Sequence, residues 1–269
     1  MTTLFLFAHQ DDEVGALHVV ADSKRRGSNV MCAFLTNGAW AGVTSETRNA
    51  ESRQALSAIG VASHEINFVG TGLGVPDGAL VEHLEHSFSS LCGIVEQLSA
   101  DGTPVTRIIM HAWEGGHQDH DSVHILGVAL ARRYGLLDAS RQFPLYRRSD
   151  NRVSLGFASP LASNGPVELM LIPWAQRLKY LAILTSYKSQ LRVIVKLLPH
   201  IMRDYATSGT QRLQRLSVSR LAQDPNVPPM LYETWNLYTY QRFRDAAQPF
   251  IDRHITNTAP HSGSTGASS

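Results

Sequence analysis

Two short stretches of the sequence concentrate side chains that bind metal ions and transfer protons. They are AHQDDE at positions 8–13 and EGGHQDH at positions 114–120. Carboxylates packed this closely would repel one another in a protein interior, and a bound cation removes that repulsion. Histidine and carboxylate ligands without cysteine favour zinc, with iron or cobalt as alternatives. Three such ligands and a water make a catalytic zinc site, and the remaining carboxylates and histidine would transfer protons. The candidates are His9, Asp11, Asp12, Glu13, Glu114, His117, Asp119 and His120.

Each stretch follows a segment that we predict to be a buried strand. Residues 4–8 (LFLFA) and 107–111 (RIIMH) are short apolar runs, typical of strands in the interior of a parallel sheet. Because the carboxyl ends of parallel strands lie at one edge of the sheet, the two stretches are expected to converge there. Gly115 and Gly116 would let the backbone of the second stretch approach the site closely.

The rest of the chain up to about residue 142 alternates predicted strands with predicted helices. Such alternation predicts right-handed crossovers and an α/β fold, a Rossmann-like, doubly wound, mostly parallel sheet. Beyond it, we expect short strands in PLYRR, SLGFA and ELMLI, and a helix at 192–205 that is broken near Pro199. The other expected strands are 30–35 and 64–69, and the other expected helices are 14–26, 47–59, 80–99, 121–134 and 174–187.

Three regions are expected along the chain. Residues 1–190 form the metal-binding domain, and residues 191–255 form a mainly helical C-terminal extension packed on the same domain. Residues 256–269 contain small residues, His and Ser without periodicity, which predicts a disordered tail.

Composition restricts the classes of partner. A net charge of +1, from 24 Lys and Arg and 23 Asp and Glu, argues against a nucleic-acid binder. The charges are uneven, because residues 1–150 contain 11 basic and 17 acidic side chains, whereas residues 151–269 contain 13 and 6. An acidic first half suits a bound cation. A basic second half suits an anionic part of a substrate, peripheral contact with an anionic membrane, or a solvated surface.

The sequence also indicates where the protein resides. No apolar stretch reaches the roughly 18 residues of a membrane-spanning helix, so no transmembrane segment is expected. The first apolar segment lacks the basic leader of a secretory signal. Cys32 and Cys92 lie in apolar segments and are expected to be reduced core residues. We therefore expect a soluble, cytoplasmic protein.

AHQDDE and GHQDH resemble the two signature stretches of the PIG-L/LmbE-type zinc-dependent N-acetylglucosamine deacetylases, whose usual forms are AHPDDE and GHPDH. The resemblance extends to TRNAESRQALSAIGV, to VPDG around Asp77 and to WAQRLKYLAILTSYKSQ near residue 180, so it covers about residues 1–190. This sequence departs from the family in having Gln10 and Gln118 in place of proline. A proline would fix φ at about −65° and would remove the backbone N–H donor at each position.

The resemblance implies a metal centre and a base. His9, Asp12 and His120 would ligate zinc, and Asp11 would be the general base that activates the zinc-bound water. From the residues alone, a double aspartate after a strand also suits capping of the following helix.

The resemblance further implies roles for four other residues. His117 would assist the tetrahedral intermediate, Asp119 would orient His117, and Arg48 and Asp77 would hold sugar hydroxyls. Arg48 and Asp77 also have ordinary structural explanations, as a residue near a helix start and an Asp before Gly in a turn. His111 and His124 are interpreted as packing or surface residues.

The implied reaction removes the acetyl group from an N-acetylglucosamine-type amino sugar on a larger aglycone and releases acetate. A phosphorylated, nucleotide-linked or lipid-linked aglycone would match the basic second half. The alternatives are an amidase acting on another amide, such as a thiol conjugate, and a non-catalytic sugar-binding protein on the same fold. The sequence predicts no particular oligomeric state.

Overall fold

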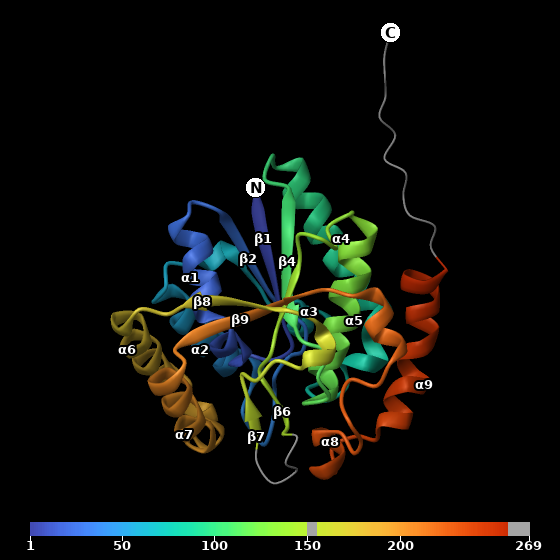
Figure 1. Cartoon of the computed structure of the whole chain (residues 1–269). Helices are drawn as coiled ribbons and strands as arrows, with labels where there is room; N and C mark the ends of the chain where they lie inside the picture. The colour runs from blue at the N-terminus through green and yellow to red at the C-terminus, as the bar shows by residue number, and fades with distance from the viewer. Residues whose placement is uncertain (150–154, 258–269) are drawn as a thin grey trace.

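The computed structural model describes residues 1–149 and 155–257 and contains a central seven-stranded sheet (Figure 1). The strand order is β3-β2-β1-β4-β5-β9-β8, with parallel pairing from β3 to β5 and antiparallel pairing at β9 and β8. This confirms the predicted Rossmann-like, mostly parallel sheet. The strands are β1 (Thr2–Phe7), β2 (Asn29–Phe34), β3 (Ile66–Asn67), β4 (Val105–His111), β5 (Arg141–Phe143), β8 (Val167–Leu171) and β9 (Thr210–Arg215), and a separate antiparallel pair comprises β6 (Tyr146–Arg148) and β7 (Leu155–Phe157).

Helices cover both faces of the sheet (Figure 1). On one side lie α1 (Leu17–Arg25), α2 (Ser45–Ser57), α6 (Trp174–Ile183) and α7 (Leu191–Thr207). On the other side lie α4 (Leu84–Ala100), α5 (Gln118–Arg133) and α9 (Tyr240–Ile251). The two remaining α-helices, α3 (Val69–Leu73) and α8 (Leu231–Thr234), are short.

Two hydrophobic clusters hold these layers together, and β1 contributes to both. Leu4 and Leu6 pack in the cluster that includes α4, α5 and α9, whereas Phe5 and Phe7 pack in the cluster that includes α1, α2 and α6. The period of two in a strand places successive side chains on opposite faces. Each fully buried side chain of this size contributes about 1.5–3 kcal/mol, so β1 is strongly held in its place.

The strand order positions the site. β1 pairs with β2 on one side and with β4 on the other, so the order of the strands reverses between β1 and β4. Ligands of open α/β sheets bind beyond the carboxyl ends of the strands at such a reversal. The two polar stretches at 8–13 and 114–120 directly follow these two strands.

The structure corrects two expectations. α7 continues through Pro199 and is not broken there. The carbonyl of Val195, which loses its helical partner, lies on the exposed side of the helix, where water can replace the lost hydrogen bond. The strand expected at 64–69 is reduced to β3, and the chain then turns into α3. Gly70 explains the turn, because a Cβ there would lie 2.3 Å from the Thr36 backbone.

The C-terminal extension is more closely integrated than expected. It supplies β9, which lies inside the sheet between β5 and β8, and α9, whose Phe243 and Phe250 are buried in the core. Cys32 and Cys92 are both buried and free, as predicted. Among the residues that the structure describes, no helix has the length and apolar character needed to cross a membrane. The predicted disordered tail lies outside the described residues from position 258 onward.

Candidate metal centre

The loop after β1 carries three polar side chains into the site. The Asp12 carboxylate accepts a hydrogen bond from the backbone N–H of His9 at 2.7 Å, which folds the loop back on itself. Asp11 has a φ of 128°, a conformation that costs a residue other than glycine on the order of 1–3 kcal/mol. Glu13 stabilises this conformation, because its buried carboxylate accepts the N–H of Asp11 at 2.8 Å.

The first turn of α5 supplies the second group of side chains. His117 is the N-cap of this helix, and its Nδ1 accepts the N–H of Asp119 at 3.2 Å. His120 lies in the first turn and is fully buried. The preceding loop packs tightly, since a Cβ on Gly116 would lie 1.9 Å from the carbonyl oxygen of Tyr146. The close approach expected of this loop is therefore present.

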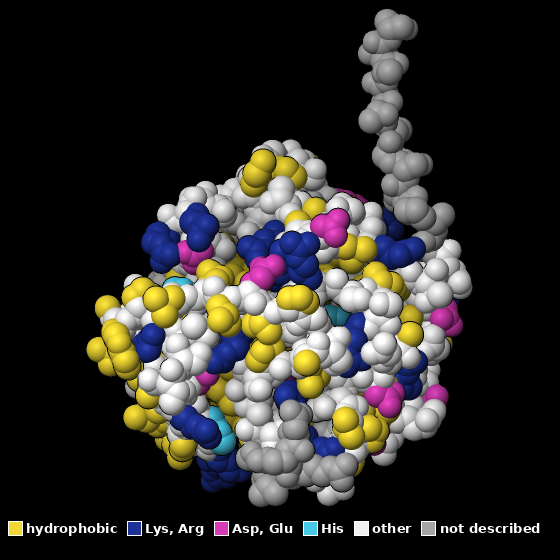
Figure 2. Space-filling view, in the orientation of Figure 1, with side chains coloured by type: hydrophobic (Ala, Val, Ile, Leu, Met, Phe, Trp, Pro, Cys, Tyr) yellow, Lys and Arg dark blue, Asp and Glu magenta, His cyan; other side chains and the backbone are white. Residues whose placement is uncertain are grey.

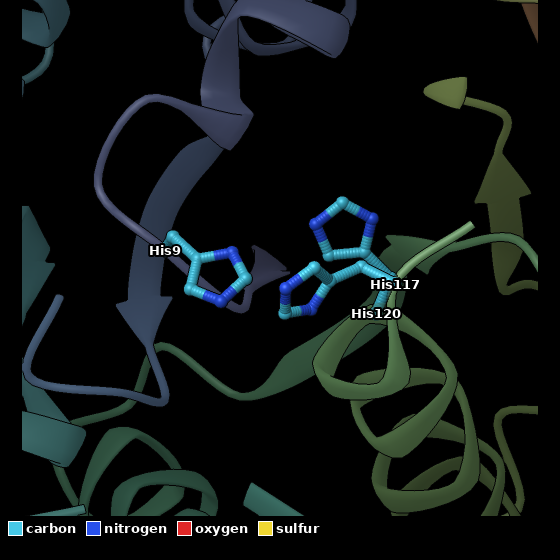
Figure 3. Close-up of side chains that lie close together, drawn as sticks. All are labelled: His9, His117 and His120. Atoms are coloured by element: carbon cyan, nitrogen blue, oxygen red, sulfur yellow. The ribbon is translucent and has the colours of Figure 1, made fainter. Parts of the chain in front are cut away.

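The predicted zinc ligands converge. The Asp12 carboxylate lies 3.3 Å from His9 Nδ1 and 3.1 Å from His120 Nε2. The ring centroids of His9 and His120 are 5.4 Å apart, and Figure 3 shows His9, His117 and His120 close together, the first from the loop after β1 and the others from the start of α5. Ligand atoms of these three histidines all lie within 4.8 Å of one another.

The donor set fits a divalent metal ion. Both ring nitrogens of His120 are buried; Nε2 lies 3.1 Å from Asp12 Oδ1, and Nδ1 has no hydrogen-bond partner among the described residues. Nε2 and the Asp12 carboxylate could therefore face the same metal ion. Burial lowers the pKa of His120 and of His117 to about 4, so both are neutral at pH 7, as ligation requires. Burial opposes the charged form of Asp12, but the nearby His120 and His111 hold its pKa well below the usual value.

Asp11 lies beside this group and is held by Arg48 of α2. The Arg48 guanidinium donates to Asp11 Oδ1 at 3.2 Å, to the carbonyl of Gly38 at 3.0 Å and to the carbonyl of Gln10. Burial raises the pKa of Asp11 to about 7, although the positive charge of Arg48 acts in the opposite direction. Arg48 is only 3% exposed, so it is a buried clamp between two loops and also a neighbour of Asp11.

Asp119 contacts His9 more closely than His117. Its Oδ2 lies 3.0 Å from His9 Nε2 and accepts the N–H of Gly78 at 2.6 Å, whereas it is 4.0 Å from His117 Nδ1. Metal-ligating histidines commonly donate their second ring N–H to a carboxylate, and Asp119 occupies that position for His9. Asp77 also lies 3.3 Å from His9 Nε2; burial opposes its ionisation, but His9 lowers its pKa to about 2.

The two glutamines that replace family prolines each tie a loop to its surroundings. Gln10 is fully buried and donates from Nε2 to Asn49 Oδ1 at 2.7 Å. Gln118 donates from Nε2 to the carbonyl of Gly78 at 3.2 Å, next to Asp77. Side-chain hydrogen bonds therefore hold the loops where a proline ring would restrict the backbone.

Three residues near the site were not assigned to it from the sequence. His111 Nε2 lies 3.2 Å from Asp12 Oδ2, and its ring stacks on His120 with centroids 4.0 Å apart. Its position at the end of an apolar strand was the one signal that the sequence offered. The ring of Tyr146 lies 5.1 Å from that of His120, and Trp235 lies 5.9 Å from Tyr146. No local pattern marks these two aromatic residues.

Comparisons with known proteins show a family and a fold to which this chain is similar. The model of the PIG-L family, described as GlcNAc-PI de-N-acetylase, matches residues 4–131. No curated protein matches the sequence. That matched segment contains both signature stretches, from His9 to His120.

Several solved structures share the fold. The A40926 pseudoaglycone deacetylase Dbv21 is 18% identical, with a TM-score of 0.58 over 79% of this chain and 96% of that chain. The zinc-inhibited form of the teicoplanin deacetylase Orf2 is 15% identical, with a TM-score of 0.58 over 81% of this chain and 99% of that chain. The N,N'-diacetylchitobiose deacetylase from Pyrococcus horikoshii is 16% identical, with a TM-score of 0.54 over 80% and 82%. At these identities the likeness to solved structures establishes the α/β fold, and residues 4–131 of this chain are similar to the PIG-L family.

Proposed function

We propose that the protein is a metal-dependent hydrolase that removes the N-acetyl group of an N-acetylglucosamine-type amino sugar on a larger aglycone. The observation that carries the proposal is the convergence of His9, Asp12 and His120 beside the Asp11 carboxylate. Zinc is the metal that this donor set favours, with iron or cobalt as alternatives. Residence in the cytoplasm stays a prediction.

The residues of the site divide the work of amide hydrolysis. His9, Asp12 and His120 would hold the metal ion, which when bound supplies a Lewis acid for the acetamide carbonyl and for the attacking water. Asp11, oriented by Arg48, would accept a proton as the water oxygen bonds to the carbonyl carbon. His117 would stabilise the oxyanion and assist protonation of the nitrogen as the C–N bond breaks. The products are acetate and a free amine.

The neighbouring residues would position the substrate. Asp77 and Arg48 are proposed to hold sugar hydroxyls, and Asp77 has the freer side chain, which is 16% exposed against 3% for Arg48. Asp119, which binds His9 and the N–H of Gly78, would fix both a ligand and the turn that carries Asp77.

Measurement of metal content together with acetate release tests the proposal. The purified protein is expected to contain about one equivalent of metal per chain and to release acetate from one member of a panel of free, nucleotide-linked and lipid-linked N-acetyl amino sugars. Asp11→Asn is expected to lose at least about 100-fold in activity while it keeps its metal. The exposed Asp101→Asn is the matched control and should keep full activity.

Three outcomes would contradict this assignment. Full activity in Asp11→Asn would show that Asp11 is not the base. Release of an amine with an acid other than acetate would favour the amidase alternative. Sugar binding without metal-dependent turnover on any substrate would favour a non-catalytic sugar-binding protein.

A further inference from the structure

One face of the molecule, formed by β8, α6 and α7, exposes a continuous series of large apolar side chains. On β8 every second residue is exposed, and Leu169 and Leu171 are 65% and 69% exposed. On α6, Trp174 and Leu178 lie one turn apart and are 63% and 65% exposed. Figure 2 shows hydrophobic side chains gathered over α6 and α7. Exposed apolar patches of this kind mark interaction surfaces on monomers.

α7 carries apolar and basic side chains in two parallel rows. Each row follows the spacing i, i+4, i+11, so its members lie along one line of the helix. The basic row is displaced from the apolar row by one residue, or about 100° around the helix axis. Ile194 and Ile201 each precede a member of the apolar row by one residue, so they lie about 100° from it on the flank away from the basic row, and they anchor the helix to the core. The exposed apolar row is Leu191, Val195 and Met202, and the exposed basic row is Arg192, Lys196 and Arg203.

The charges around this face are almost all positive. Lys179 is exposed in the middle of α6, and Lys188 is exposed in the segment between α6 and α7. Between residues 167 and 207 the sequence contains two acidic side chains. Glu168 binds Arg141 at 2.9 Å, and Asp204 binds Arg212 at 2.7 Å, so both are already neutralised.

We propose that the face formed by β8, α6 and α7 binds the surface of an anionic lipid membrane. Apolar side chains beside a row of Lys and Arg are the pattern of helices that lie in the membrane interface. The apolar row would enter the acyl boundary, and the basic row would meet the lipid phosphates. Two copies of this chain joined by the same face would instead bring two basic rows together, which like-charge repulsion disfavours.

This face adjoins the hairpin at the candidate metal centre. α7 contacts β7, and β7 pairs with β6, which carries Tyr146 beside His120. Binding to a lipid surface would therefore bring the centre close to a lipid-linked substrate. Membrane binding itself does not depend on the proposed hydrolysis, so the test below measures binding alone and stands if the enzymatic assignment fails.

Vesicle flotation of the full chain provides the test. The protein is expected to float with vesicles of phosphatidylcholine and phosphatidylglycerol in equal parts, and to float far less with phosphatidylcholine alone. Added salt should weaken the binding, because the attraction between charged surfaces is screened. The fluorescence of Trp174 should shift to shorter wavelength on binding, and Trp174→Phe should lose that change.

Matched variants separate specific binding from general charge. Arg192→Gln with Lys196→Gln should lower the partition coefficient about 25-fold, because each basic side chain near an anionic surface contributes about fivefold. Arg132→Gln with Arg133→Gln removes the same charge from the end of α5, on the other side of the sheet, and should change it less than about twofold.

Substitution of the apolar row tests insertion. Leu191→Ser with Val195→Ser and Met202→Ser should reduce binding to the mixed vesicles more than about tenfold. Leu191, Val195 and Met202 are exposed, so the melting temperature of the triple variant should stay close to that of the wild type. The proposal is overturned if the wild type does not float with the mixed vesicles, or if both glutamine pairs weaken binding equally. A dimer that the triple serine variant dissociates would assign the face to a second copy and would also overturn it.

Discussion

Glu114 is a buried carboxyl group that is expected to make the stability of the protein fall as the pH rises. Its side chain is in the loop between β4 and α5, is 1% exposed, and accepts the N–H groups of Leu145 and Tyr146 at 2.8 and 3.1 Å. Burial, with the nearby Asp121, raises the pKa of Glu114 from 4.5 to about 8. The folded protein therefore keeps this group protonated at pH 7, where the unfolded chain has lost the proton.

The sign and size of the effect follow from these two pKa values. Below pH 4.5 both states bind the proton, and the group does not make stability depend on pH. Between pH 4.5 and about 8 the unfolded state binds fewer protons, so the free energy of unfolding falls by about 1.4 kcal/mol per pH unit. Glu114→Gln keeps an acceptor for both N–H groups and cannot ionise. The variant should match the wild type near pH 4.5 and exceed it by at most about 5 kcal/mol at pH 8.

Urea unfolding from pH 5 to pH 8, with the metal removed from both proteins, measures this difference. The exposed Glu96→Gln is the control, and its difference from the wild type should stay constant with pH. Parallel stability curves for Glu114→Gln and the wild type would refute the reasoning, because the carboxyl group would then be ionised in the folded state.

Three further predictions concern the loops and the metal. Arg48→Lys loses the forked contact with the carbonyls of Gln10 and Gly38, so it should lower the free energy of unfolding in urea by about 2 kcal/mol or more and should also lower kcat. An unchanged urea midpoint would contradict the role of Arg48 as a clamp. Gln118→Pro should fold, since the first position of a helix accepts proline, but should raise KM more than it lowers kcat because the bond to Gly78 is lost. Removal of metal by a chelator should lower the melting temperature and abolish turnover, with both restored by zinc; a melting temperature indifferent to zinc would count against the site.

The sequence predicted the parts of the structure that depend on local pattern. β1 and β4 are short apolar runs, and their burial on both faces needs no knowledge of distant contacts. The convergence of His9, Asp12 and His120 followed from one further rule, that the carboxyl ends of parallel strands share an edge. The assignment of roles to these residues came from the family resemblance, and it stays a prediction.

The remaining features depend on contacts that local pattern does not encode. β9 lies between β5 and β8 although long segments separate these strands in the chain, so its place is decided by tertiary pairing. Tyr146 reaches His120 because Glu114 binds the backbone before and at this residue. Periodicity carries no information about such long-range contacts, since it reports only which face of an element is buried.

The two glutamines show how a loop can be held in more than one way. A proline restricts the backbone at its own position, whereas Gln10 and Gln118 restrain the loops through partners in α2 and in the turn at Gly78. Each such hydrogen bond contributes about 0.5–1.5 kcal/mol, similar to the gain from a well-placed proline. Unlike a proline, Gln118 links the start of α5 to the turn that bears Asp77. A movement of either segment should therefore displace the other. The positions of α5 and of the turn that bears Asp77 are therefore expected to depend on one another in this protein.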